Sequence, residues 1–274
     1  MKSQVKEWLE SGTIDIFLGM KIVDGHPLPH AFTRHNISDL EDLVPGTVRY
    51  PLEKFAAELA AENSSARIGL AARECTQRAL NVLSLWNQVP TDRIETIKMN
   101  CCPSPLKEHA VCSYLDPPEA GLFKKHFGID NAADPDTIGK FEPQERFSRW
   151  MYEFQKCIKC YGCRNICPVC FCDDCSLEHE DLIGTGQLPP EAPIFHLVRA
   201  VHMAGRCIDC GLCEEACPAD IPLRLLYRKV NAVVDDLFDY RAGEGEQPPP
   251  FTIIGERPSL APKPMENGSA CPQS

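Results

Sequence analysis

Residues 157–175, "CIKCYGCRNICPVCFCDDC", place seven cysteines within 19 residues. The first four have the spacing C-x2-C-x2-C-x3-C and precede a proline, and residues 207–218, "CIDCGLCEEACP", repeat this pattern. In bacterial ferredoxins with two 4Fe-4S clusters, three thiolates of such a run bind one cube and the fourth binds the cube of the other run. The repeated run therefore predicts two 4Fe-4S clusters in one chain.

This crossover divides eight cysteines into two predicted sets of ligands. Cluster one is assigned to Cys157, Cys160, Cys163 and Cys217. Cluster two is assigned to Cys207, Cys210, Cys213 and Cys167. Zinc is the competing metal, but two pairs of ligands complete a tetrahedral zinc site, so the third cysteine and the C-P step would be surplus. A structural zinc-binding protein is the less favoured alternative, and no residue is predicted to be catalytic.

Three further cysteines follow the first run and are not needed by either cube. Cys170, Cys172 and Cys175 have the spacing C-x-C-x2-C, which could supply three ligands of a third site for a 4Fe-4S cluster or a zinc ion. The fourth donor would come from Cys101 or Cys102 in the N-terminal part of the chain. The alternative is that these thiols are free cysteines that pack as small apolar side chains.

Composition limits the classes of function. The 274 residues, 43% of them hydrophobic, are enough for one large domain or two ordinary ones. The first residues, "MKSQVKEWLESG", lack the apolar core of a signal peptide, so we expect a cytoplasmic protein whose 16 cysteines bind metal rather than form disulfides. A formal charge of −11 argues against nucleic acid and anionic membranes, and no apolar run reaches transmembrane length. We expect protein partners and no direct membrane insertion.

The N-terminal part of the chain alternates between strand and helix patterns. The segments "TIDIFLGMKIV", "ARIGLAA" and "RIETIKMNCC" are typical of strands, whereas "YPLEKFAAELAAEN" and "ECTQRALNVLSLWNQV" are typical of amphipathic helices. This alternation predicts a small α/β domain, with Cys75 and the pair Cys101 and Cys102 at the carboxyl ends of strands. It contains no G-x-G-x-x-G and no P-loop, so no motif supports an FAD or other nucleotide site.

Helical patterns surround the second cysteine run. The lead-in "APIFHLVRAVHMAGRC" and the following "IPLRLLYRKVNAVVDDLFDY" both have apolar residues at helical spacing, which resembles an α-helical ferredoxin rather than the compact hairpin type. The predicted fold class is therefore α+β, with an α/β domain followed by a helical ferredoxin-like domain. The expected boundaries are 1–115 for the α/β domain, 116–148 for a linker, 149–242 for the two-cluster domain and 243–274 for an extended proline-rich tail.

Several segments together resemble a known family. The order "IGLAARECTQRAL", "RIETIKMNCCPS", "CIKCYGCRNICPVCFCDDC" and "FHLVRAVHMAGRCIDCGLCEEACPADIPL" resembles iron–sulfur beta-type subunits of cytosolic formate dehydrogenases and deazaflavin-reducing hydrogenases, whose relatives accompany heterodisulfide-reductase-like proteins. The resemblance covers roughly residues 1–240. Its most specific parts are the first cysteine run, with its three additional cysteines, and the lead-in to the second run.

The resemblance implies an electron-transfer subunit of a multi-subunit anaerobic redox complex. Such a subunit relays single electrons through two or three 4Fe-4S clusters and need not catalyse chemistry itself. The implied partners are redox subunits that carry flavin, clusters, molybdenum or tungsten, held together in a hetero-oligomer. The alternatives are a flavin-bearing oxidoreductase subunit, which would need an FAD site within residues 1–115, and the structural zinc-binding protein.

Overall fold

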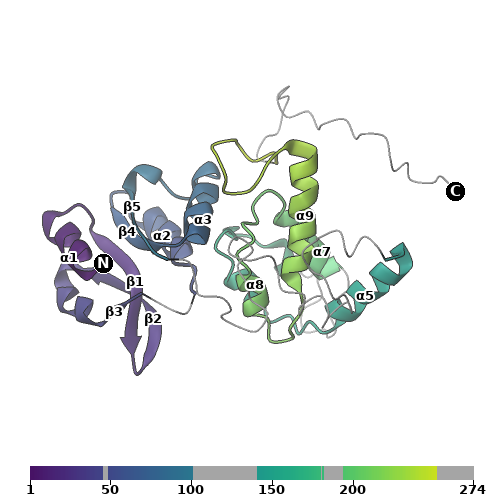
Figure 1. Ribbon diagram of the computed structural model, residues 1–274, viewed down its shortest axis with the longest axis horizontal. Coiled ribbons are helices and arrows are strands. Elements are labelled where there is room, and N and C mark those ends of the chain that lie inside the picture. The colour runs from purple at the N-terminus through teal and green to yellow at the C-terminus, as the bar shows by residue number, and fades with distance from the viewer. Residues whose placement is uncertain (46–48, 101–140, 180, 182–193, 252–274) are drawn as a thin grey trace.

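The computed structural model describes residues 1–45, 49–100, 141–179, 181 and 194–251. In these residues a mixed sheet with flanking helices precedes a helical unit that carries the cysteine runs (Figure 1). The fold is therefore of the mixed helix-and-sheet class predicted from the sequence. Most of the predicted linker lies outside the described residues, and so does the predicted boundary at 115.

The sheet has the strand order β2-β1-β4-β5, and β3 also pairs with β1. Its strands are β1 (Ile16–Val23), β2 (His26–Thr33), β3 (Leu43–Val44), β4 (Ile68–Ala72) and β5 (Ile94–Lys98). β1 pairs antiparallel with β2 and β3 and parallel with β4, which in turn pairs parallel with β5. Parallel neighbours need crossover connections, and α2 (Leu52–Glu62) and α3 (Glu74–Leu85) lie within these two connections.

The predicted strands and helices of this unit are confirmed, but five elements were not predicted. These are α1 (Lys2–Ser11), β2, β3, the 3₁₀ helix η1 (Arg34–Asp42) and the short 3₁₀ turn η2 (Thr91–Arg93), which precedes β5. β2 contains two prolines, which are tolerated because it lies at the edge of the sheet. Asp24 and Gly25, both with positive φ, form the two-residue hairpin turn into β2.

Helix α3 joins the sheet to the cysteine-bearing unit. Leu80 and Leu83 pack in the core beneath the sheet, whereas Ala79 and Val82 belong to the core that contains the cysteine runs. Figure 1 shows α3 between the sheet and the helical unit. The sequence pattern predicted a helix with one buried face, and the structure buries two.

The helical unit surrounds the two cysteine runs. Its helices are α5 (Pro143–Gln155), α6 (Gly162–Asn165), η4 (Ser176–Glu178), α7 (Ile194–His202), α8 (Leu212–Glu215) and α9 (Leu223–Phe238). α7 and α9 are the two helices predicted around the second run. α5 begins inside the predicted linker because Pro143 at its first turn and Glu145 suit a helix N-terminus. No described helix combines the length and the apolar character needed to cross a bilayer.

The first residues of the predicted tail pack against the rest of the protein. Asn81 Nδ2 of α3 donates a hydrogen bond of 3.1 Å to the Gly243 carbonyl, and the ring of Phe251 lies 5.4 Å from that of Phe238. A Cβ atom on Gly243 would lie 2.6 Å from the Arg78 carbonyl oxygen, so this approach requires glycine. Residues 252–274 lie outside the described part of the chain.

We predict a pH-dependent stability from Glu53, which is 3% exposed in α2. Burial raises the pKa of its carboxyl to about 7, although Arg73 opposes the rise. The folded state therefore binds this proton more tightly than the unfolded state, so the contribution to stability falls as the pH rises through about 7. Glu53→Gln mimics the protonated form and should raise the free energy of unfolding at pH 8 by about 3 kcal/mol, and by less at pH 6.

Urea unfolding followed by tryptophan fluorescence at the two pH values measures this difference. Glu58→Gln is the matched control because Glu58 lies on the same helix but is exposed. An equal effect of the two substitutions at pH 8 would contradict the prediction.

Candidate functional site

The two cysteine runs form loops with the same backbone conformation. Lys159 and Tyr161 of the first run and Asp209 and Gly211 of the second have positive φ, at equivalent positions of the repeat. One helical turn follows each loop, α6 in the first and α8 in the second, and the two turns contact each other. The left-handed residues curl each loop around its thiols, and the Lys159 amide donates to Cys157 Sγ over 3.4 Å.

The fourth cysteine of each run lies with the thiols of the other run. Burial raises the pKa values of Cys157 and Cys163, and the charge of Cys217 adds to this rise in both. Burial also raises the pKa values of the second-run thiols, and the charge of Cys167 adds to the rise in all three: Cys207, Cys210 and Cys213. Cys217 therefore lies near the first-run thiols and Cys167 near the second-run thiols, and the ligand assignment predicted from the spacing stays a prediction.

These buried thiols suit a bound cluster. The pKa of Cys163 is raised to about 11 and that of Cys207 to about 12, so each thiol keeps its proton unless a cation is bound to its sulfur. Soft thiolate donors are the ligands that iron–sulfur clusters require. No three donors among the described residues converge on a single-ion site, and a cube does not require this because each thiolate binds a different iron.

Arg199 of α7 is a buried cation near both runs. Its side chain is 3% exposed, its Nη2 donates to the Cys163 carbonyl over 2.8 Å, and its guanidinium lies over the Tyr227 ring at 5.8 Å. A buried cation beside the thiols offsets the negative charge of a thiolate-ligated cluster. Arg224, which lies near the second run, is also buried, at 6% exposed.

Two arginines of the α/β unit also hold the second cysteine loop, and the sequence did not reveal them. Arg49 Nη1 donates to the Cys210 carbonyl over 2.6 Å, and its Nε donates to Glu215 over 3.2 Å. Arg78 Nη2 of α3 donates to the Ile208 carbonyl over 3.2 Å. These partners are 161 and 130 residues away in the chain, so no local pattern marks either contact.

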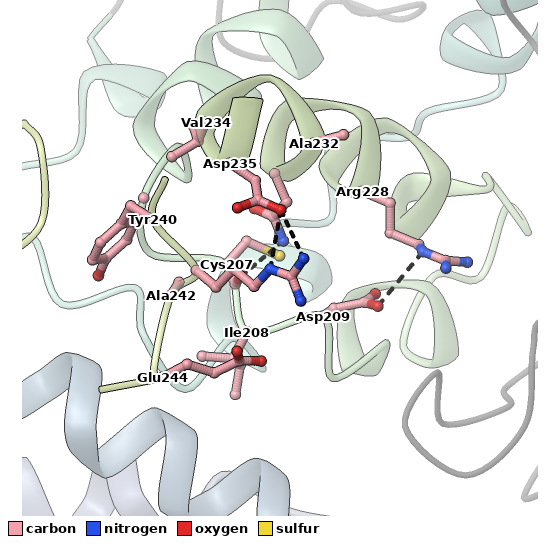
Figure 2. A pocket seen from close by; sticks show the side chains of 13 residues that line it. Cys207, Ile208, Asp209, Arg228, Ala232, Val234, Asp235, Tyr240, Ala242 and Glu244 are labelled. Carbon is pink, nitrogen blue, oxygen red and sulfur yellow. Dashed lines mark hydrogen bonds and ion pairs between the residues drawn. The ribbon is translucent and has the colours of Figure 1, made fainter. Parts of the chain in front are cut away.

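A cavity of about 280 Å³ lies beside the second run (Figure 2). Cys207 lines it, and Asn231 Nδ2 donates to the Cys207 carbonyl over 2.9 Å. The ion pairs Arg228–Asp209 and Arg241–Asp235, at 3.6 and 3.0 Å, lie in its wall. Figure 2 shows Cys207 among these charged side chains, so cluster two would lie next to a polar surface hollow.

The structure also places the cysteines of the predicted third site. Cys170, Cys172 and Cys175 line a single cavity, and Cys172 is exposed. Cys101 and Cys102, the expected sources of a fourth ligand, lie outside the described residues. Cys75 lies in the first turn of α3, directly after β4 as predicted, and contributes to the electrostatic surroundings of the second run.

Comparison with known proteins places the chain among iron–sulfur proteins. A model of the 4Fe-4S binding domain family matches residues 200–222, which contain the second run. The F420-dependent formate dehydrogenase subunit beta of Methanocaldococcus jannaschii is 41% identical over 113 residues, which are 41% of this chain and 30% of that relative. The F420-dependent formate dehydrogenase 1 subunit beta of Methanococcus maripaludis is 41% identical over 109 residues, 40% of this chain and 28% of the relative. The chain is an iron–sulfur protein related to formate dehydrogenase beta subunits.

This relationship confirms the family resemblance found in the sequence. The chain spans less than one third of the length of either relative. The observation that the family model matches the second run agrees with the iron–sulfur chemistry predicted from its spacing.

We predict that Arg49 is essential to the stability of the second loop. Arg49→Met would leave the Cys210 carbonyl and the largely buried Glu215 carboxylate without this cation, at a cost of about 3 kcal/mol. The temperature at which the visible cluster absorbance is lost should fall by roughly 5–10 °C. Arg67→Met is the control because the Arg67–Asp15 pair is half exposed, and it should leave that temperature nearly unchanged. Equal shifts in the two variants would show that the loop does not depend on Arg49.

Proposed function

We propose that the chain is an electron-transfer subunit of a multi-subunit anaerobic redox complex of the formate dehydrogenase, hydrogenase or heterodisulfide-reductase type. The observation that carries the proposal is that the thiols of both runs lie in one core, with Cys217 near the first-run thiols and Cys167 near the second-run thiols. In this proposal, cluster one is held by Cys157, Cys160, Cys163 and Cys217, and cluster two by Cys207, Cys210, Cys213 and Cys167. Bound 4Fe-4S clusters supply one-electron chemistry.

The residues of the chain set the conditions for this chemistry. The core that contains the cysteines includes Val169, Ile208 and Ile221, all nearly inaccessible to water. Arg199 and the loop amides provide positive charge and hydrogen bonds, which favour the reduced and more negative state of a cluster. The α/β unit contributes by fixing the second loop through Arg49 and Arg78.

The positions of two thiols support separate routes for entry and exit of electrons. Cys160 of the first run is exposed, and Cys207 of the second lines the cavity of Figure 2. A donor and an acceptor can therefore approach different clusters from different surfaces. We propose redox subunits that bear flavin, clusters, molybdenum or tungsten as these partners, in a hetero-oligomer. The relatives are named as subunits of F420-dependent formate dehydrogenases, which supports this class of partner.

The first test concerns the assignment of ligands. Anaerobically purified protein should contain at least about eight iron and eight acid-labile sulfide per chain, because two cubes need four of each. Cys167→Ala should remove about four of each, and the lost cluster should be cluster two, although Cys167 belongs to the first run. Cys75→Ala, near the second run but outside the ferredoxin pattern, should retain the full content.

Three results would overturn this assignment. If the purified protein contained zinc and no acid-labile sulfide, it would hold a structural zinc site and no clusters. If Cys167→Ala lost cluster one, identified by its separate redox and magnetic spectrum, the predicted crossover would be wrong. If Cys75→Ala lost as much iron as Cys167→Ala, Cys75 of the α/β unit would also be a cluster ligand.

The second test concerns the role in electron transfer. In the native complex, purified without oxygen, the substrate of the complex should reduce the clusters of this subunit within the turnover time. Freeze-quench magnetic resonance measures this reduction, and clusters that stay oxidised during turnover would contradict the proposed role. Heat denaturation of the isolated subunit should release no flavin. Stoichiometric release of flavin would instead support a flavin-bearing oxidoreductase subunit.

A further inference from the structure

The three cysteines outside the ferredoxin pattern lie in a cavity with three arginines. The cavity, of about 140 Å³, is lined by Cys170, Cys172 and Cys175, by Arg164, Arg199, Arg206 and Lys54, and by the carboxylates of Asp173, Asp174 and Glu178, among others. Arg199 Nη1 lies 3.8 Å from Cys170 Sγ, and Arg206 Nη1 lies 3.6 Å from Cys172 Sγ. Arg164 makes a side-chain hydrogen bond to Cys175. Each thiol is thus matched with its own guanidinium.

Other contacts hold each arginine in its place. Arg206 stacks on the Trp86 ring at 3.8 Å and on the Phe171 ring at 4.6 Å. Arg164 pairs with Glu178 at 2.7 Å, and Arg199 is hydrogen-bonded to the carbonyl of the first loop. The guanidinium groups are therefore positioned before any ligand binds, as a built site requires.

Arg199 also has unused donor capacity at this site. Its side chain is 97% buried, and Arg199 Nε has no hydrogen-bond partner within the described residues. A buried guanidinium with an unused donor is costly unless an acceptor, preferably an anionic one, is nearby. Neutral thiols are weak acceptors, whereas thiolates and the sulfide of a cluster carry negative charge.

We propose that Cys170, Cys172 and Cys175 ligate a third iron–sulfur cluster in this cavity, with the three arginines compensating its negative charge. Each thiol releases its proton to solvent as its sulfur binds iron. Three thiolates and a cluster form an anionic group, and the cations that line the cavity, three arginines and Lys54, outnumber its three carboxylates. A single zinc ion, with sulfur ligands at about 2.3 Å, would leave most of this cavity empty.

The location of the cavity gives the third cluster a role. Arg199 contacts both Cys170 and the backbone of Cys163 in the first loop, so one side chain bridges this site and the first loop. The cavity and its contacts support the metal site independently of the proposed function. Its use as a third step for electrons rests on the proposed function.

Metal analysis of the anaerobically purified full chain tests the site. The parent protein should contain about twelve iron and twelve sulfide per chain, and Cys172→Ser about eight of each. Cys172 is exposed, so serine at this position leaves the apolar core unchanged. Cys271→Ser, which removes a thiol outside all the cysteine motifs, is the matched control and should retain about twelve of each.

Several results would overturn the third cluster. About eight iron in both the parent and Cys172→Ser would do so while leaving the two-cluster function intact. Loss of one zinc ion from Cys172→Ser, without loss of sulfide, would assign a structural zinc site instead. A parent protein without sulfide would overturn the third cluster and the proposed function together.

Substitution of Arg206 tests the charge compensation separately from the ligands. Arg206→Gln should lower the reduction potential of the third cluster, because removal of a nearby cation disfavours the added electron, and should leave the iron content unchanged. Arg206→Lys keeps the charge and should restore most of the potential. A redox titration followed by magnetic resonance measures each variant. Equal potentials in the parent and in Arg206→Gln would contradict a cluster beside this arginine.

Discussion

The close approach of the two cysteine loops is the constraint on which the rest of the helical unit depends. Cys217 lies with the thiols of the first loop and Cys167 with those of the second. The two loops therefore cannot move apart without separating a set of four thiols. Helix α7 leads into the second loop, and α9 packs against α7 and α8, so the helices around the runs hold the second loop in place.

The α/β unit is tied to this arrangement from the side of the second loop. Helix α3 packs one face on its own sheet and another on the cysteine-bearing core. Arg49 and Arg78 then use backbone carbonyls of the second loop as acceptors. Every residue has a backbone carbonyl, so these contacts do not depend on which side chains the loop carries. They fix the position of the loop, and its side chains remain available to bind metal.

The sequence predicted best what depends on neighbouring residues. The spacing of Cys157, Cys160 and Cys163 predicted the loop, and the patterns of α3 and α9 predicted helices in the right places, because thiol geometry and apolar periodicity are local properties. The ligand assignment itself still rests on the spacing and awaits metal analysis. The contacts of Arg49 and Arg78 could not be predicted because they join residues far apart in the chain. The prolines of β2 concealed an edge strand, and the polar start of α5 resembled a linker.

The close approach of Gly243 to Arg78 has a consequence for biosynthesis. Helix α3 leaves the ribosome long before residue 243, so the side of the helix that faces Gly243 stays exposed until the C-terminal segment arrives. Both predicted sets of four thiols are complete once residue 217 has emerged, which is earlier than this contact. The cysteine loops are thus synthesised before the segment that packs against α3.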